Sequence, residues 1–241
     1  MSTAQVLTML GAVLIAATAQ QTAGFGFSLL GVPLMALSLE THDAVVIATW
    51  LGLLSSGVQA VEGRPLAHWA TVRRLVIGTL VGIPFGLLVF TKVDEGVLKI
   101  VLGASVLVAT VVLARDFRLT RPGSAPEWLA GIVSGALAAS LSTNGPPLVF
   151  VLQARRMGIA EFRATLNQVF VVANVAALLG FAITGELSAH ASSWAMAGVP
   201  VVGLGLLAGR RLRPLVGEVH GRRVVLVLLA LAGTSAIVTA L

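Results

Sequence analysis

The sequence predicts an all-α polytopic membrane protein built from two inverted repeats. Each repeat is predicted to be a broken or re-entrant helical hairpin followed by three transmembrane helices. Of the 241 residues, 57% are hydrophobic and only 11% are charged, whereas soluble domains carry about 25% charged residues. The apolar residues form long windows without charge, and two of these windows contain similar glycine and proline breaks. These observations together carry the fold prediction.

Composition excludes several classes of protein. A mean hydropathy of +0.97 excludes a soluble or disordered chain. The net charge is +6, but the 16 Lys and Arg residues are spread thinly between apolar windows. We therefore predict no nucleic-acid partner and interpret the basic excess as a topology signal. The absence of cysteine excludes disulfides and thiolate chemistry. The 4 His residues lack metal-ligand spacing, so neither a metal nor a cofactor is predicted.

The charge-free windows predict the individual helices. A membrane-spanning helix needs about 20 apolar residues. Six windows fit one crossing each; they are 44–61, 75–91, 100–114, 164–185, 187–209 and 224–241. Window 100–114 is long enough when it is extended back to Gly96, with Lys99 reaching the interface. Windows 1–39 and 128–154 are too long or too broken for one regular helix. The first is kept as structure because it lacks the basic start and the small-residue cleavage site of a signal peptide.

Both long windows contain helix breakers after small and polar residues. The first reads Gln20-Gln-Thr-Ala-Gly-Phe-Gly-Phe-Ser-Leu-Leu-Gly-Val-Pro-Leu, and the second reads Ser140-Leu-Ser-Thr-Asn-Gly-Pro-Pro-Leu. Each reaches a Gly-x-Pro-Leu stretch, and each is followed by three ordinary windows. We therefore predict a first membrane repeat at 1–114 and a second at 128–241. Residues 115–127, which include prolines and a glycine, are predicted to be a cytoplasmic linker.

The distribution of Lys and Arg predicts the orientation. Connections 62–74, 115–127, 155–163 and 210–223 are basic, whereas 40–43 and 186–190 carry no Lys or Arg. The positive-inside rule places the basic connections in the cytoplasm and both termini outside, on the periplasmic side of an inner membrane. Window 128–154 then enters and leaves on the cytoplasmic face, as a hairpin of two short helices or a re-entrant loop. The alternative is eight plain crossings, which would put Arg155, Arg156 and Arg163 outside.

The two broken segments are the predicted substrate site. Irregular backbone inside a membrane is tolerated where it lines a cavity, and paired breaks in two repeats point to a transporter's site. Free N–H groups at helix starts favour an anion, and the broken segments hold neutral donors and no charged residue. The predicted substrate-binding residues of the breaks are Gln20, Gln21, Gly24, Gly26, Ser28, Gly31 and Pro33, with Ser140, Ser142, Thr143, Asn144, Gly145 and Pro147. The alternative is that these residues only kink helices or allow close packing.

Two further polar positions belong to this prediction. Asn167 and Asn174 share one helix face and either line the same cavity or bond a neighbouring helix. Glu40, His42 and Asp43 are candidates for proton coupling, because histidine titrates near neutrality, or they form a solvated loop.

At the two breaks the sequence resembles the sulfite exporter TauE/SafE family, also called the toluene sulfonate uptake permease family. The stretch Gly24-Phe-Gly-Phe-Ser-Leu-Leu-Gly-Val-Pro-Leu is similar to its glycine-rich motif, and Ser142-Thr-Asn-Gly-Pro-Pro-Leu is similar to its second motif. Asn144 stands where many members would have glycine. The resemblance covers essentially the whole chain. It implies a bacterial inner membrane and transport of small sulfur-containing anions such as sulfite, thiosulfate and sulfonates, including sulfoacetate.

The leading hypothesis is a secondary transporter, acting as a permease or exporter of a small anion by alternating access. Its expected partners are the anion, the lipid bilayer and a proton or sodium ion for coupling; the sequence carries no signal for an oligomeric state. The alternatives are a passive anion channel, a transporter of a non-sulfur organic anion, or a structural membrane subunit. An enzyme is not expected, because a Gly-x-Ser-x-Gly elbow, a phosphate-binding Walker motif and an embedded Asp pair are all absent.

Overall fold

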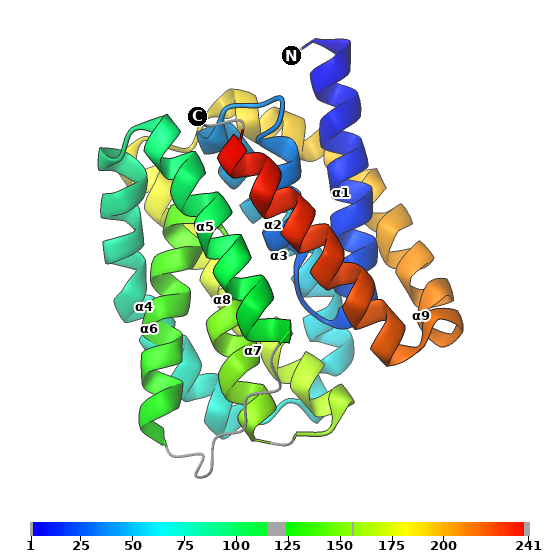
Figure 1. Ribbon diagram of the computed structural model, residues 1–241. Helices are drawn as coiled ribbons and strands as arrows, with labels where there is room; N and C mark the ends of the chain where they lie inside the picture. The colour runs from blue at the N-terminus through cyan, green and yellow to red at the C-terminus, as the bar shows by residue number, and fades with distance from the viewer. Residues whose placement is uncertain (1, 115–123, 156, 239–241) are drawn as a thin grey trace.

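Every predicted window forms a helix. The computed structural model describes residues 2–114, 124–155 and 157–238, with their side chains except those of 112–113 and 215–225. All regular elements in this part of the chain are helices (Figure 1), so the all-α class is confirmed. They are α1 (Thr3–Ala23), α2 (Phe27–Met35), α3 (Thr41–Gly63), the 3-10 turn η1 (Arg64–Leu66), α4 (Trp69–Lys92), α5 (Glu95–Ala114), α6 (Ser124–Leu141), α7 (Gly145–Ala154), α8 (Ile159–Thr184) and α9 (Ala189–Val238).

Each broken segment is a long helix followed by a short one. The 21 residues of α1 span about 31 Å, enough to cross a bilayer alone, whereas α2 has 9 residues. In the second segment, α6 has 18 residues and α7 has 10. The first helix of each pair is therefore longer than the short hairpin helix that the sequence suggested. The regular run continues until Gly24 in one segment and Ser142 in the other, where the backbone turns left-handed.

Five described segments are long and apolar enough to cross a membrane, and they make this a multi-pass membrane protein. They are α1, α3 with η1, α4, α8 and the first part of α9, Ala189–Pro214. The full α9 has 50 residues and would reach about 75 Å if straight. Instead it turns back on itself (Figure 1) and continues in a second apolar arm, Leu226–Val238. The predicted connection 210–223 is thus helical backbone at a bend, with Pro214 inside it.

Glycines bring α4 and α6 into direct backbone contact. Gly78, Gly82 and Gly86 recur every fourth residue on α4, and face Gly131 and Gly135 on α6. A Cβ on Gly82 would lie 2.0 Å from the carbonyl oxygen of Ile132, and one on Gly135 would lie 2.0 Å from that of Thr79. Small residues of this kind allow two helices to approach closely in a membrane.

Two further helix pairs pack in the same way. A Cβ on Gly205, in the first arm of α9, would lie 2.6 Å from the Cβ of Ala17 on α1. In the second arm, Gly233 faces α5, where a Cβ on Gly103 would lie 2.8 Å from the Gly233 carbonyl oxygen. The two arms of α9 therefore pack mainly on first-half helices.

The helices of the two halves correspond in order and spacing. Gly145, the start of α7, follows Phe27 at the same sequence distance as Ile159, the start of α8, follows Thr41. The same distance separates Ser142 from Gly24. The two Gly-x-Pro-Leu stretches do not correspond in this register, because Gly31 lies inside α2 and Gly145 begins α7. The sequence match between them is displaced by about one helical turn.

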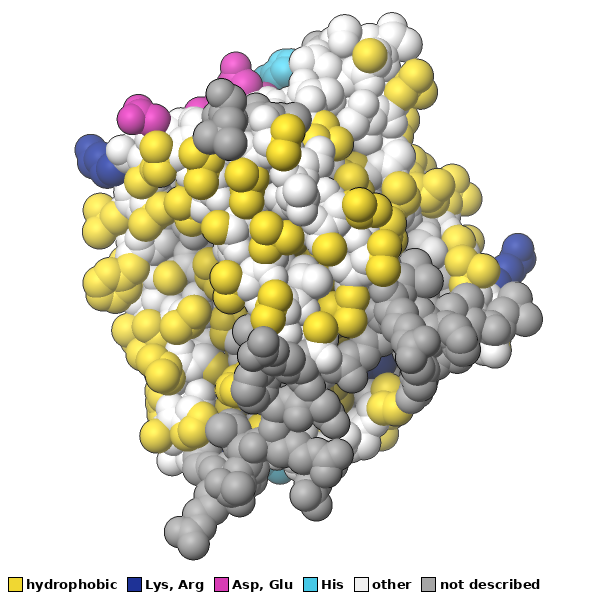
Figure 2. Space-filling view, viewed as in Figure 1, with side chains coloured by type: hydrophobic (Ala, Val, Ile, Leu, Met, Phe, Trp, Pro, Cys, Tyr) yellow, Lys and Arg dark blue, Asp and Glu magenta, His cyan; other side chains and the backbone are white. Residues whose placement is uncertain are grey.

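On the face shown in Figure 2, exposed apolar side chains cover the middle of the molecule, and Asp and Glu side chains lie at its upper end. Phe85 is 60% exposed and Ile183 is 86% exposed, as expected for side chains that face lipid. Helix α6 begins at Ser124, so the last residues of the predicted linker are helical. The remaining linker residues, 115–123, lie outside the described part of the chain, as does Arg156.

Candidate functional site

The two breaks meet near the middle of the bundle. Gly24 and Gly26 have φ angles of +90° and +102°, and Ser142 has φ +56°. Glycine adopts this left-handed region easily, whereas serine does so rarely. Among the described residues Ser142 is the one non-glycine residue in this conformation, and its Oγ lies 3.1 Å from Ser28 Oγ across the break. A strained residue that touches the opposite break marks this region as a candidate functional site.

Two short helices begin beside this contact. Gly26 precedes α2 and Asn144 precedes α7, and neither helix start has a side-chain hydrogen bond as a cap. Uncapped first-turn N–H groups carry a partial positive charge. In α7, Pro146 follows Gly145 and lacks an N–H group, so fewer backbone donors are available there than at α2. Side-chain donors are therefore more important at the second break.

A small cavity, which we call the central cavity, lies between the two helix starts. Its volume is about 20 Å³, which is room for a single water because one water needs about 10–15 Å³. No charged side chain lines it. Its lining residues are Gln20, Gly26, Phe27, Ser28, Leu29, Gly52, Ser56, Ser142, Thr143, Asn144, Gly145, Phe170 and Asn174. The structure thus brings together most of the polar residues that the sequence selected at the breaks.

Two donors at the central cavity have no hydrogen-bond partner. These are the Thr143 hydroxyl and the Asn144 side-chain amide nitrogen. Thr143 is 2% exposed and Asn144 is 7% exposed. A buried donor without a partner costs about 1–3 kcal/mol, so both groups favour a ligand that accepts hydrogen bonds. The Asn144 carbonyl, in contrast, accepts a bond of 2.9 Å from the Ser134 hydroxyl, which holds this residue in place.

Helix α3 completes the cavity wall, and the sequence analysis did not select it. Thr49 Oγ1 lies 3.1 Å from Ser142 Oγ, and Gly52 and Ser56 line the cavity. Thr49, Gly52 and Ser56 are spaced to share one helix face. That stripe of small and polar residues inside an apolar window was the available signal. A Cβ on Gly52 would lie 3.3 Å from Ser28 Oγ and 3.5 Å from the Asn174 amide nitrogen.

A hydrogen-bonded layer lies between the central cavity and the end of the bundle that carries Arg163 and Arg213, which we call the basic end. Gln20 accepts a bond of 2.7 Å from the Ser55 hydroxyl, and its amide nitrogen lies 3.4 Å from Asn167 Oδ1. Asn167 in turn donates to the Arg163 carbonyl at 2.8 Å. Asn167 therefore bonds a neighbouring helix, whereas Asn174 lines the central cavity.

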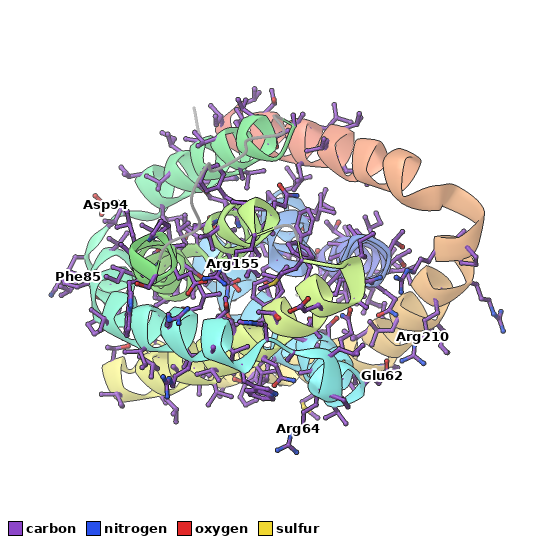
Figure 3. All side chains as sticks on the ribbon, turned by 90° about the horizontal axis from the view of Figure 1, so that it is seen from below. Glu62, Arg64, Phe85, Asp94, Arg155 and Arg210 are labelled. Atoms are coloured by element: carbon purple, nitrogen blue, oxygen red, sulfur yellow. The ribbon has the colours of Figure 1, made fainter. Side chains whose placement is uncertain are left out.

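A second cavity lies beyond this layer, and we call it the basic cavity. Its volume is about 180 Å³. The buried Arg163 donates to the Gln21 carbonyl at the end of α1, and Glu62 is paired with Arg210. Figure 3 views the molecule from this end and shows Glu62 and Arg210 side by side at its edge. The lining residues are Gln21, Gln59, Glu62, Gly63, Ala160, Arg163, Ala164, Asn167 and Arg213.

The other predicted site residues line neither cavity. Gly24 forms the first break and lies against the Arg163 side chain, whose Cγ would be 2.6 Å from an added Cβ. Gly31 packs toward Ala16 inside the bundle, with Pro33 buried two residues further along α2. The Ser140 hydroxyl bonds the Ala136 carbonyl of its own helix at 2.7 Å. Pro147 is half-buried in the first turn of α7.

Two clusters of charged side chains lie outside these cavities. Glu127 is 0% exposed and pairs with Arg74 at 2.8 Å and with Arg155. This cluster joins α4, α6 and the end of α7. At the opposite end of the bundle, His42 lies 3.9 Å from Glu95, and Asp43 of the same helix start pairs with His190. Within the described residues, no group of three or more His, Cys, Asp or Glu is placed to hold a metal ion.

A polytopic helical membrane protein with two uncapped half-helices around a neutral polar cavity has the features of a membrane transporter. The family model "Sulfite exporter TauE/SafE" matches residues 9–236, and the chain belongs to this family of membrane transporters.

Two relatives are similar along most of their length. A "Probable sulfite/organosulfonate exporter TauE" of Cupriavidus necator is 30% identical over 230 residues, which cover 92% of this chain and 90% of the relative. A "Probable inner membrane transporter protein TsaS" of Comamonas testosteroni is 29% identical over 175 residues, which cover 70% of this chain and 72% of the relative. No solved structure matches the chain.

Proposed function

We propose that the protein is a secondary transporter of small sulfur-containing anions, such as sulfite, thiosulfate or a sulfonate like sulfoacetate. The anion binds in the central cavity between the starts of α2 and α7. The observation that carries this proposal is the pair of buried, unpartnered donors, Thr143 and Asn144, beside two uncapped helix starts. An oxyanion would accept hydrogen bonds from all of them. The name of the Cupriavidus relative supports the sulfur chemistry.

The residues around the central cavity suit weak, reversible binding. Neutral donors and helix starts offer partial charges rather than a full counter-ion, so the anion can leave again. Phe27, Leu29 and Phe170 supply apolar surface on the same cavity, where the carbon part of a sulfonate would lie. The cavity of about 20 Å³ is too small for such an anion as it stands. Transport therefore requires a conformation in which the two breaks separate.

The packing pattern supports two inverted repeats, at 1–114 and 128–241, whose helix pairs move against each other to alternate access to this site. Helices α1 and α6 run in opposite directions (Figure 1). The contacts are also related by the repeat. Helix α4 packs on α6, and their counterparts, the first arm of α9 and α1, pack on each other. Helix α3 packs on its own counterpart, α8. We infer that the basic end faces the cytoplasm, with both termini outside. Since the chain has no cysteine, single cysteines can test this orientation with an impermeant thiol reagent.

The test is uptake of radiolabelled sulfite into liposomes that contain the purified chain. Asn144→Ala removes one unpartnered donor without adding bulk. A hydrogen bond to a charged group contributes about 1.5–3 kcal/mol, so the half-saturation concentration should rise roughly ten- to a hundredfold. Thr143→Val should also raise it. Thr110→Val is the matched control, because the Thr110 hydroxyl bonds only its own helix in α5, at 2.7 Å from the Val106 carbonyl.

The same liposomes separate the alternative functions. Imposed proton or sodium gradients identify the coupling ion, and acetate or other carboxylates compete if the anion contains no sulfur. Uptake that does not saturate and responds to no gradient would instead indicate a passive anion channel. If Asn144→Ala and Thr143→Val transport sulfite as the Thr110 control does, the central cavity is not the binding site.

A further inference from the structure

The basic cavity differs from the central cavity in charge and size. It is about 180 Å³ in volume, against about 20 Å³ for the central cavity, and it contains Arg163 and Arg213. Its carboxylate, Glu62, is paired with Arg210 outside the lining. Two guanidinium groups around a cavity with one neutralised carboxylate give a positive local potential, which raises the local concentration of anions.

One buried group in the basic cavity lacks a partner. The Gln21 side chain is 7% exposed, and its Oε1 atom forms no hydrogen bond. The oxygen and nitrogen of a glutamine amide exchange places by a simple flip, so Gln21 can turn its amide nitrogen toward a bound oxyanion. The cavity therefore combines positive charge with an amide group whose buried oxygen has no protein partner.

Arg163 is held rigidly at this position. It is 8% exposed and donates to the Gln21 carbonyl. Gly24 allows this placement, because an added Cβ would lie 2.6 Å from Arg163 Cγ and 2.9 Å from its Nε. The first break and the basic cavity are thus built together. A contact of 3.4 Å joins Gln20, which lines the central cavity, to Asn167, which lines the basic cavity.

Two key positions of this cavity lining have apolar counterparts in the described part of the other repeat unit. In the register that matches α2 with α7, Arg163 corresponds to Val45 and Gln21 corresponds to Ala139. Both counterparts are apolar and 0% exposed. Arginine and glutamine at these two positions therefore distinguish the basic cavity from the corresponding region of the fold.

We infer that the basic cavity is a second anion-binding subsite, where the oxyanion head of the transported anion rests beside Arg163 and Arg213 before or after it passes Gln20 and Asn167. The inference rests on the proposed function. Because the corresponding positions Val45 and Ala139 are apolar, the subsite makes transport asymmetric: the half-saturation concentration is lower at the basic face than at the opposite face.

A purely structural role is the competing explanation for Arg163, because an arginine at a helix end satisfies backbone carbonyls. Arg213 separates the two explanations. It lines the cavity, is itself exposed, and can be replaced without burying a new group. Arg211 is the matched control. It is also exposed and lies two residues earlier on α9, so it points to another face of the helix.

The experiment measures uptake of radiolabelled sulfite by inside-out and right-side-out membrane vesicles that contain the full chain. We expect Arg213→Gln to raise the half-saturation concentration about threefold to fivefold in inside-out vesicles. The value should stay unchanged in right-side-out vesicles, and Arg211→Gln should match the unsubstituted chain on both faces. The maximal rate of Arg213→Gln should change little, because the central cavity is intact.

Three results would overturn the inference. The first is an equal half-saturation concentration for Arg213→Gln and Arg211→Gln while the unsubstituted chain transports sulfite. This result would refute the subsite but not the proposed function. The second is an equal change on both faces. The third is an effect that disappears in liposomes free of anionic phospholipid, which would assign the cavity to a lipid headgroup. If the unsubstituted chain transports no oxyanion at all, the proposed function and this inference fail together.

Discussion

The backbone contact between α4 and α6 allows a quantitative prediction about one methyl group. In Gly82→Ala, the new Cβ would lie 2.0 Å from the Ile132 carbonyl oxygen and 2.8 Å from its carbonyl carbon. Ordinary contact begins at 3.4 Å, and the obstacle is backbone, which cannot rotate away as a side chain can. The two helices would have to separate, and the neighbouring contacts of Gly78 and Gly86 with α6 would then be weakened as well.

The expected result is a loss of stability. Overpacking a tight interface costs about 1–3 kcal/mol, although alanine regains up to about 1 kcal/mol of helix propensity over glycine. We expect Gly82→Ala to lower the midpoint of thermal unfolding in detergent by roughly 5 °C, measured by the fraction that remains monodisperse after heating. Gly203→Ala is the control, because Gly203 is also helical and has nothing within 4 Å of an added Cβ. Equal midpoints for the two variants would refute the close-packing argument.

Two further predictions concern buried polar groups. Glu127→Gln leaves Arg74 and Arg155 without their carboxylate, and should destabilise the protein by about 3–5 kcal/mol. Thermal unfolding in detergent checks this, and a loss no greater than that of Glu62→Gln, at the exposed pair with Arg210, would contradict it. Ser142→Gly should fold as well as the unsubstituted chain, because glycine accepts the φ of +56°. It should nevertheless slow sulfite uptake, since the hydroxyl that contacts Ser28 and Thr49 is lost; unchanged uptake would remove Ser142 from the site.

Hydrophobic windows and breakers were sufficient to predict the helices and the region of the candidate site. Regular apolar runs have only the helix as a way to satisfy their backbone in a membrane. The interruptions at Gly24–Gly26 and at 142–144 therefore marked where irregular backbone must find polar surroundings. Ser28, Ser142 and Asn144 line the central cavity for this reason.

The correspondence between the halves was harder to obtain from sequence. The paired Gly-x-Pro-Leu letters suggested that Gly31 matches Gly145, but the structure places Gly145 at a helix start and Gly31 inside a helix. The feature that the halves share is a left-handed residue, Gly24 in one and Ser142 in the other. Different residue types can adopt a left-handed backbone, so a comparison of the two sequences does not reveal this shared feature.

Contacts between distant segments were also invisible in the sequence. The sequence predicts Glu127 as the last residue of a cytoplasmic linker, because nothing local shows that Arg74 and Arg155 surround it. Thr49 and Gly52 lie inside an apolar window, and only the packing of α3 brings them to the central cavity. A single small or polar residue in a membrane helix does not show which helix or cavity it faces until its neighbours in the fold are known.

The packing restricts how the central cavity can open. The glycine contacts join α4 with α6 and α1 with the first arm of α9, and each pair takes one helix from each half of the sequence. Backbone-to-backbone contacts tolerate little sliding, so these pairs have to move as units during transport. The contact between the breaks is different, because it consists of the Ser28 and Ser142 hydroxyl groups, 3.1 Å apart, and oxyanion oxygens can replace such a hydrogen-bond partner. Under the proposed function, the moving bodies are therefore the two mixed helix pairs rather than the two sequence repeats, and the anion replaces the hydroxyl contact that holds the breaks together.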